Sequence, residues 1–433
     1  MPEFLWQKDD AVTDEQLMNF MAGEDVLLDR VLFPFDIRAS RAHAVGLARI
    51  GLLNDQELAA ISRVLDQLGQ KFENGEFVLD ERFEDGHSAI EHFLTEQLGE
   101  TGKKIHTGRS RNDQVLVATR LFLIHALTRL DGYCREIARE FLVKAKEGEH
   151  TPMPGYTHLQ HAMVSSAGLW FAAFAEAFID DAMLARQTRK WLDCNPLGTA
   201  AGFGVNIALD RELTTRELGF ARLQLNPMYA QNSRGKFELQ ALSAFWQAAL
   251  DLRRFAWDLS LFVMPECGYV ILPERYTTGS SIMPNKRNPD VIELLRGVGG
   301  VIQGAMTELN SLLSLPSGYH RDLQLTKAPV LRAINRALAA LQLLPELVSS
   351  LRLDEERLAK SIEPEMYATD RALELVGEGV AFRDAYRQAL DDEAELARRT
   401  PVDSVRQRIS PGAPGNLGLP LLKERLRALD ESK

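Results

Sequence analysis

Apolar residues recur at helical spacing over long stretches in the middle of the chain. From Asp113 to about Lys146 there is no proline, and apolar positions repeat every three to four residues, as on one face of an α-helix. The same pattern predicts four more long helices, over 162–193, 235–263, 289–313 and 328–353. Pro345 is expected to interrupt or kink the last of them, because proline removes a backbone donor inside a helix.

These stretches are longer than ordinary globular helices, and a helix of about 30 residues is about 45 Å long. Five of them predict an elongated bundle. The segment Leu169–Ala175 is apolar around most of the helix, which is typical of a helix buried on all sides. Because a single five-helix bundle is thin, we expect it to pack against copies of itself.

The remaining chain predicts short helices. One covers Asp55–Phe72, and the last eighty residues form a small helical segment. We find no period-two strand pattern and no sequence repeat. The expected fold is therefore all-α, with an N-terminal helical domain at 1–106, a central bundle at 107–353 and a small C-terminal domain at 354–433.

Composition narrows the functional classes. A formal net charge of −11 disfavours nucleic acid or an anionic membrane as partner, although a few cations gathered in one cleft still suit an anionic small molecule. No apolar stretch has the length of a membrane span. Residues Met1–Asp10 carry no secretion signal, which favours the cytoplasm. Cys134, Cys194 and Cys267 lie far apart, so neither a disulfide framework nor a cysteine metal site is expected.

Candidate chemistry is found in the polar connectors between the long helices. The connector Thr277–Pro289 combines glycine, serines and prolines with Lys286 and Arg287, and it leads directly into a helix with Pro289 at its first position. Cations beside a helix N-terminus favour an anion. The alternative interpretation of this connector is a simple helix-entry loop.

A second connector, Thr151–His161, places His158 just after a Pro/Gly turn and before a long helix, which makes it an acid–base candidate. His158 and His161 also form an HxxH pair. No third ligand has convincing spacing, so no metal is expected.

Two further connectors are rich in hydrogen-bond donors. His106–Gln114 contains two arginines, whose forked guanidinium groups suit carboxylates; the alternative is a capped helix start with solvated charges. Leu315–Gln324 joins polar and aromatic residues between two long helices.

Together these segments resemble a known family. The run Gly279-Ser280-Ser281, followed by Pro284, Lys286 and Asn288, resembles the signature loop of the fumarase/aspartase superfamily. The segments 106–114, 154–160 and 315–324 resemble the argininosuccinate lyases in particular, and the matching blocks extend from about Asp36 to Lys327.

The resemblance implies three helical domains whose central bundles form a twenty-helix core in a homotetramer, with active sites shared between subunits. It implies a cofactor-free anti elimination that releases fumarate and arginine from argininosuccinate, a step of arginine biosynthesis. A base removes a Cβ proton of the succinyl part, the carbanion is held as an aci-carboxylate, and an acid protonates the departing guanidino nitrogen. Fixed cations and N–H donors are the natural stabilisers of that charge.

By position, Ser280 corresponds to the family's base, His158 to the histidine of the acid step, and Glu293 to the carboxylate that orients this histidine. Lys286 corresponds to a catalytic group near the developing charge. The residues that correspond to the substrate-binding set are Ser110, Arg111, Asn112, Thr157, Asn288, Tyr319, Arg321, Gln324 and Lys327.

Departures from the family pattern leave alternatives open. Gly23–Arg30 lacks the usual Asn/Ser-containing stretch, Leu325–Thr326 replaces an acidic pair, and His320–Arg321 replaces Asn-Lys. The alternatives are a fumarate-releasing lyase acting on N-acylated argininosuccinate or on adenylosuccinate, an inactive homologue of the lens-crystallin kind, and a serine amidase that uses Ser280 with Lys286.

Overall fold

The computed structural model describes residues 20, 24–80 and 82–431, so Met1–Asp10 and Gly23 lie outside the described residues. The chain divides into two compact units. Unit 1 comprises Met1–Arg129, Ala185–Ala244 and Ile302–Arg336, and unit 2 comprises Leu130–Leu184, Phe245–Val301 and Ala337–Lys433.

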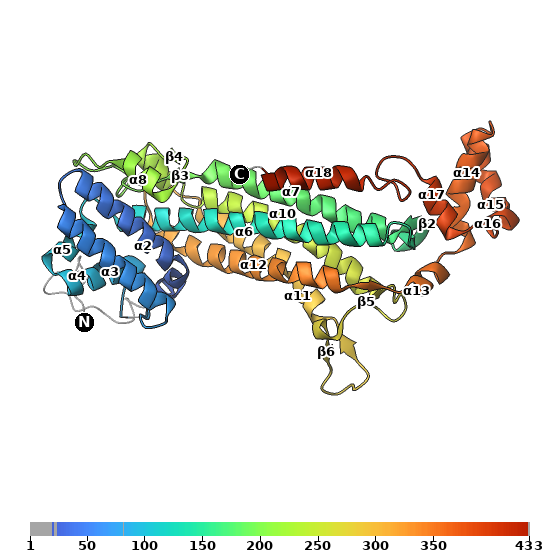
Figure 1. Ribbon diagram of the computed structural model, residues 1–433, viewed down its shortest axis with the longest axis horizontal. Helices are drawn as coiled ribbons and strands as arrows, with labels where there is room; N and C mark the ends of the chain where they lie inside the picture. The colour runs from blue at the N-terminus through green and yellow to red at the C-terminus, as the bar shows by residue number, and fades with distance from the viewer. Residues whose placement is uncertain (1–19, 21–23, 81, 432–433) are drawn as a thin grey trace. The chain divides into compact units, whose positions relative to one another are not determined.

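The five long helices that the apolar spacing predicts are present (Figure 1), and each has residues in both units. They are α6 (Arg111–Glu147), α7 (Ala167–Leu192), α10 (Lys236–Phe262), α11 (Asp290–Leu312) and α12 (Lys327–Ser350). Pro345 was expected to interrupt or kink this helix; it lies within α12, which continues past it to Ser350, so it does not interrupt the helix. Pro289 precedes α11, whose first helical residue is Asp290. No described helix is both long enough and apolar enough to cross a membrane.

The start of α7 differs from the prediction by five residues, because a strand occupies 160–166. The Ser166 hydroxyl accepts a hydrogen bond from the Leu169 amide at 3.1 Å and so caps the helix. Ala162 and Met163 therefore belong to a hairpin rather than to the helix that their apolar character suggested.

Unit 1 is built around the helices that precede α6. They are α2 (Asp25–Arg49), α3 (Asp55–Glu73), α4 (Gly86–Leu98), α5 (Glu100–Lys103) and the 3-10 turn η1 (Lys104–His106). The first of them, α2, has 25 residues and is longer than the short helices expected there. A capping box starts α3: the Asn54 side chain accepts from the Glu57 amide at 2.9 Å, and Glu57 accepts from the Asn54 amide at 3.0 Å. Phe33, Leu65 and Leu94 are fully buried in the shared core of these helices.

The rest of unit 1 consists of short elements. They are β3 (Cys194–Asn195), α8 (Arg211–Leu218), β4 (Arg222–Leu223), α9 (Pro227–Asn232) and the 3-10 turn η3 (Arg321–Thr326). β3 and β4 pair in parallel. The buried Asn195 side chain donates to the Thr214 and Thr215 hydroxyls at 3.2 and 3.0 Å and thereby fixes α8 to β3.

The core of unit 2 is aromatic. The ring of Phe141 on α6 stacks on Phe178 of α7 at 5.9 Å between centroids and meets Phe255 of α10 edge-on at 5.0 Å. All three side chains are fully buried, and burying an aromatic side chain contributes about 2–3 kcal/mol each. The unit-2 segments of these three helices therefore form one packed layer.

Short strands occur in unit 2, although the sequence showed no strand pattern. They are β1 (Pro152–Thr157), β2 (Gln160–Ser166), β5 (Val270–Ile271), β6 (Thr278–Gly279), β7 (Arg287–Asn288) and β8 (Arg352–Leu353). Three antiparallel pairs result, β1–β2, β5–β8 and β6–β7. Prolines and a bulge interrupt the alternation in β1, which explains why it gave no period-two signal.

Small helices complete unit 2. They are η2 (Glu274–Tyr276), α13 (Glu355–Lys360), η4 (Pro364–Tyr367), α14 (Ala368–Gly377), α15 (Phe382–Asp391), α16 (Glu393–Leu396), α17 (Pro401–Gln407) and α18 (Leu419–Glu431). Val164 of β2 packs with Met366, Tyr367 and Val405 in a small core. This core joins the β1–β2 hairpin to η4 and α17.

Candidate active site

The catalytic candidate His158 stands at the tip of the β1–β2 hairpin. His158 and Leu159 form the two-residue turn, with φ of 57° and 59°, as in a type I′ turn. Such turns normally use Asn-Gly, because side chains disfavour left-handed backbone. Non-glycine residues held there cost about 1–3 kcal/mol each and gather at functional sites. Both side chains are exposed, Leu159 at 74%.

The strands β1 and β2, which lead into and out of this turn, pack closely against each other. A Cβ at Gly155 would lie 2.7 Å from the Met163 carbonyl oxygen, so glycine is required at the bulge. One residue further on, the Tyr156 hydroxyl lies 3.2 Å from His161 Nε2 and 2.6 Å from the Tyr269 hydroxyl. The predicted substrate-binding residue Thr157 pairs with Gln160 next to the turn and is exposed.

Ser280 lies in the loop between β6 and β7. Its hydroxyl oxygen accepts the amide N–H of Met283 at 3.1 Å and that of Ile282 at 3.4 Å. These two donors would also stabilise a serine alkoxide, because hydrogen bonds to the charged form favour it. The Ile282 side chain is 83% exposed, so the loop presents its residues to the surroundings.

The other candidates of this region lie on the same hairpin or just after it. Lys286 is exposed at the end of the loop, and Asn288 is half-buried in β7. Glu293 lies in the first turn of α11, where its carboxylate accepts from Arg296 at 3.3 Å. The Arg296 guanidinium in turn lies 4.1 Å from the centre of the Trp257 ring.

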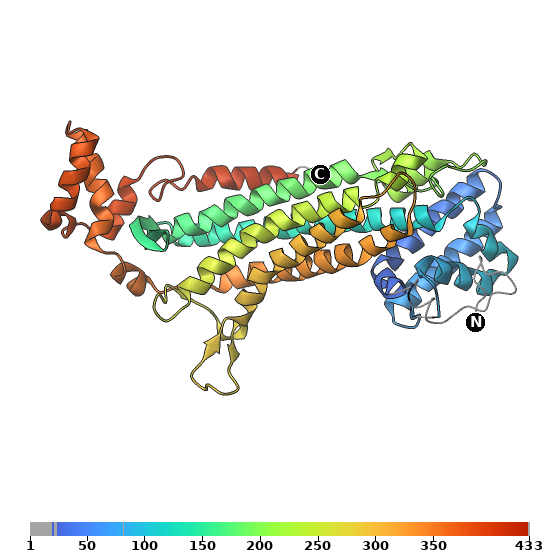
Figure 2. The ribbon, with the colours of Figure 1, turned by 180° about the vertical axis from the view of Figure 1, so that it is seen from behind.

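Within one chain, His158 is not brought to the other catalytic candidates. Among the described residues no hydrogen bond or ion pair joins it to Ser280 or Glu293. In Figures 1 and 2 the β6–β7 hairpin projects from α11, well away from β2, and both views agree.

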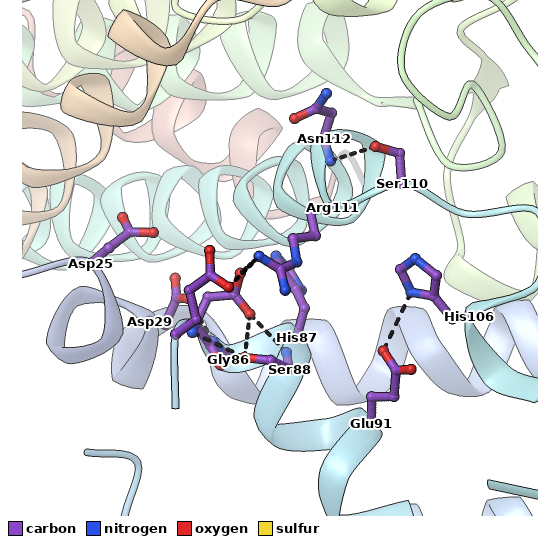
Figure 3. A network of polar contacts seen from close by, with 12 residues as sticks. Asp25, Asp29, Gly86, His87, Ser88, Glu91, His106, Ser110, Arg111 and Asn112 are labelled. Atoms are coloured by element: carbon purple, nitrogen blue, oxygen red, sulfur yellow. Dashed lines mark hydrogen bonds and ion pairs between the residues drawn. The ribbon is translucent and has the colours of Figure 1, made fainter. Parts of the chain in front are cut away.

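In unit 1 the candidates Ser110, Arg111 and Asn112 form the start of α6. The Ser110 hydroxyl accepts the Asn112 amide at 3.3 Å (Figure 3). The Ser110 amide donates to Asp113 Oδ1 at 2.9 Å. The other oxygen of the buried Asp113 accepts the amides of Gly198 and Ala200, each at 2.9 Å. These bonds fix where the helix begins and which way its first side chains point.

Arg111 faces acidic groups at the start of α4. Its guanidinium lies 2.7 Å from Glu84 and 3.6 Å from Asp85 (Figure 3). Asp85 also caps α4 by accepting the Ser88 amide at 2.7 Å. Burial raises the pKa of Asp85, but His87, Arg111 and Ser88 outweigh it and leave the pKa below its usual value. Arg111 remains partly exposed and can still reach a ligand.

Lys327, at the start of α12, lies in a buried ion triplet. Its ammonium is 2.8 Å from Asp25 Oδ1 and 2.6 Å from Asp29 Oδ1, and its side chain is 3% exposed. Asp29 Oδ2 also accepts the Gly86 amide at 2.8 Å, which joins the triplet to the start of α4.

Two histidines in this network have perturbed pKa values. Burial lowers the pKa of His87, but the Asp36 carboxylate paired with it prevails and raises the pKa to about 8. His106, near Glu91, has the opposite balance: burial and the charge of Arg109 lower its pKa to about 4. The two rings therefore carry different charges at neutral pH.

The predicted substrate-binding residues Tyr319, Arg321 and Gln324 lie in η3 or just before it. The Tyr319 ring centre lies 5.8 Å from the Arg234 guanidinium, and Arg321 and Gln324 belong to η3 itself. Arg321 is exposed and Gln324 is half-buried.

Sequence reasoning missed two groups of residues at these places. The acidic partners Asp29, Glu84 and Asp85 were not singled out, although Asp85 to Ser88 has the spacing of a helix cap. Tyr156 lay inside a connector that was singled out for its histidines alone. Among the described residues no group of three or more His, Cys, Asp or Glu side chains could hold a metal ion.

Comparisons with known proteins show which family the chain belongs to. The family model described as lyase matches residues 10–304. A protein named argininosuccinate lyase from Xylella fastidiosa, strain Temecula1, is 56% identical over 432 residues, which cover 100% of this chain and 97% of that protein. One of the same name from Stenotrophomonas maltophilia, strain R551-3, is 55% identical over 430 residues, 99% of this chain and 100% of that protein.

Solved structures share the fold at lower identity. An EDDS lyase in complex with formate has a TM-score of 0.78 at 22% identity and covers 97% of this chain and 91% of its own. The 3-carboxy-cis,cis-muconate lactonizing enzyme of Pseudomonas putida has a TM-score of 0.71 at 18% identity, covering 96% and 98%. With the full-length identity to the relatives named above, the chain belongs to the argininosuccinate lyase family of the fumarase/aspartase superfamily.

Proposed function

We propose that this chain cleaves argininosuccinate into arginine and fumarate by β-elimination. A base takes a proton from the succinyl carbon next to the carbon that bears nitrogen. The C–N bond breaks, the electron pair left on carbon becomes the double bond of fumarate, and the guanidino nitrogen leaves with a proton from an acid. The observation that carries this proposal is the 55–56% identity to argininosuccinate lyases over essentially the whole chain.

Ser280 is the proposed base. Serine is a poor base in water, so its alkoxide needs stabilisation. The amides of Ile282 and Met283 already point at its oxygen, and the Lys286 ammonium is on the same loop. Preorganised donors of this kind are often the largest catalytic contribution.

His158 is the proposed partner in the acid step, with Glu293 as the carboxylate that orients it. An imidazole can hold and release a proton near neutral pH, and its position at an exposed hairpin tip leaves it free to meet a substrate. Glu293 is exposed in the first turn of α11, so it too can approach a group outside its own chain.

The proposed substrate-binding residues fit a dianionic succinyl group. The Arg111 fork suits a carboxylate, and the hydroxyl and amide side chains add further donors. The proposed set is Ser110, Arg111, Asn112, Thr157, Asn288, Tyr319, Arg321, Gln324 and Lys327. In the free protein Arg111 and Lys327 are held by acids, so substrate carboxylates must compete with those acids for them.

We further propose a homotetramer in which different subunits supply Ser280 and His158 to one site. The separate positions of the two hairpins support this assembly. So does the surface of α11: Leu294 is 60% exposed, and exposed Gly297 and Gly300 have open space where a Cβ would be. An apolar face with glycines lets another helix approach closely, and helices of a second copy are the natural occupants.

A substrate panel tests the proposed reaction. The purified protein is incubated separately with argininosuccinate, an N-acylated argininosuccinate and adenylosuccinate, and fumarate is followed by its ultraviolet absorbance. We expect release from argininosuccinate at a kcat/KM at least about a hundred-fold above the others. Faster release from another substrate, or no release at all, would reject the proposal.

A further inference from the structure

The His158–Leu159 turn needs support from outside itself. Both residues adopt left-handed backbone, which non-glycine residues keep only when the surroundings determine it. The turn has no Asn-Gly pair to favour that conformation, and the side chains at its tip are exposed. The support must come from the strands immediately below.

The first cross-strand pair with side-chain contacts is Tyr156 and His161. The two residues are opposite each other in the register, with ring centres 5.1 Å apart and planes at 51°. The Tyr156 hydroxyl is 3.2 Å from His161 Nε2. This pair closes the hairpin two residues from His158 and thus limits how the turn can move.

Tyr269 anchors the pair to the body of unit 2. Its hydroxyl is 2.6 Å from that of Tyr156, and the Tyr269 side chain is buried. The Tyr269 amide donates to the Phe262 carbonyl at 2.9 Å, and its own carbonyl accepts the Asp354 amide at 2.9 Å. Burial and the Tyr269 hydroxyl raise the pKa of Tyr156, so its phenol stays neutral. The hairpin is therefore tied to the end of α10.

The other side of His161 faces Glu363. The Nδ1 atom lies 3.6 Å from the Glu363 carboxylate, which precedes η4. Four side chains thus contact one another in a row: Tyr269, Tyr156, His161 and Glu363. Each end of the row is attached to a different segment of unit 2, and its middle lies beneath the turn.

We propose that Tyr156 and His161 are positioning residues that hold the His158 turn in its left-handed conformation for the acid step. The inference rests on the proposed function for the role of His158. Neither side chain needs to touch substrate, because both act through the backbone that carries His158.

The test begins with Tyr156→Phe, which removes one hydroxyl and keeps the ring. Losing the two hydrogen bonds should lower kcat about ten-fold, leave KM within about two-fold and leave the melting temperature nearly unchanged. Tyr386→Phe is the matched control, since that tyrosine is exposed on α15. His161→Gln, which keeps a polar contact with Tyr156, should retain more activity than His161→Ala.

A double-mutant comparison separates positioning from a general structural role. If Tyr156 acts through His158, Tyr156→Phe should lower kcat in the wild type but cause less than about two-fold further loss when added to His158→Ala. An equal loss in both backgrounds would overturn the proposal, as would a Tyr156→Phe enzyme with unchanged kcat.

Hydrogen exchange of the peptide covering 152–166 provides a readout that does not depend on catalysis. Exchange should accelerate in Tyr156→Phe at this hairpin and not in Tyr386→Phe. If the wild type releases no fumarate, the proposed function fails, and the exchange result alone decides whether Tyr156 holds the hairpin. Identical exchange in the two variants would overturn that role.

Discussion

The Lys327 ammonium lies 2.6 Å from the Asp29 carboxylate, although the two residues are 298 positions apart in the chain. Asp25 completes the triplet at 2.8 Å. The contact fixes the start of α12 to α2 within unit 1. It also means that a lysine proposed to bind substrate is already neutralised in the free protein.

Replacing Lys327 should destabilise the folded protein. Lys327→Met leaves the buried Asp29 carboxylate and the half-buried Asp25 carboxylate without their cation, and we expect a loss of about 3–5 kcal/mol in the free energy of unfolding. Urea denaturation at fixed protein concentration measures it. The matched control is Lys104→Met, whose partner Glu57 belongs to a much more exposed pair, so its expected loss is much smaller. Equal losses in the two variants would contradict the assignment of a buried triplet.

The free energy of unfolding should decrease at alkaline pH because His87 loses its proton. Its pKa is about 8 in the folded protein, above the ordinary value near 6.5, so its protonated form stabilises the fold. That contribution is complete below about pH 6.5 and is lost as the pH rises through about 8, a change of about 2 kcal/mol. Denaturation between about pH 6 and pH 9 measures the slope. Asp36→Asn should flatten it, and an unchanged slope would contradict the pairing.

The five long helices could be predicted because the period of apolar residues is a local property. Four of the five starts lie within two residues of the prediction. The β1–β2 hairpin could not be predicted in this way, since His158-Leu159 lacks the Asn-Gly signal of a two-residue turn and prolines break the alternation.

The candidate site residues could be named from the family resemblance, but the side chains that pair with them could not be predicted from the sequence. The resemblance indicated Arg111 and Lys327, but the acids that neutralise them come from distant segments. Which distant side chains meet depends on packing rather than on spacing along the chain. The same holds for Tyr156 and Tyr269, which are 113 positions apart.

Subunit exchange tests the shared site. His158→Ala and Ser280→Ala should each keep only a small residual activity, but a mixture allowed to exchange subunits should regain far more, because some sites receive neither substitution. With equal amounts and random shuffling, about a quarter of the sites are intact. Mass measurements verify the exchange. If exchanged tetramers stay inactive, both residues belong to one chain.

Chelators should leave turnover unchanged, since the elimination needs only a base and an acid. Activity is measured after dialysis against a chelator and again after adding back single divalent ions. Loss that one added ion restores would contradict a cofactor-free elimination.

The most direct measurement is the release of arginine and fumarate from argininosuccinate by the wild type and by Ser280→Ala, alongside calorimetric binding of the substrate. The wild type should release the two products in equal amounts. Ser280→Ala should lose at least about a thousand-fold in kcat while it remains folded and binds substrate, because the base is missing but the binding groups remain. Near-normal turnover in Ser280→Ala, or no products from the wild type, would contradict the account.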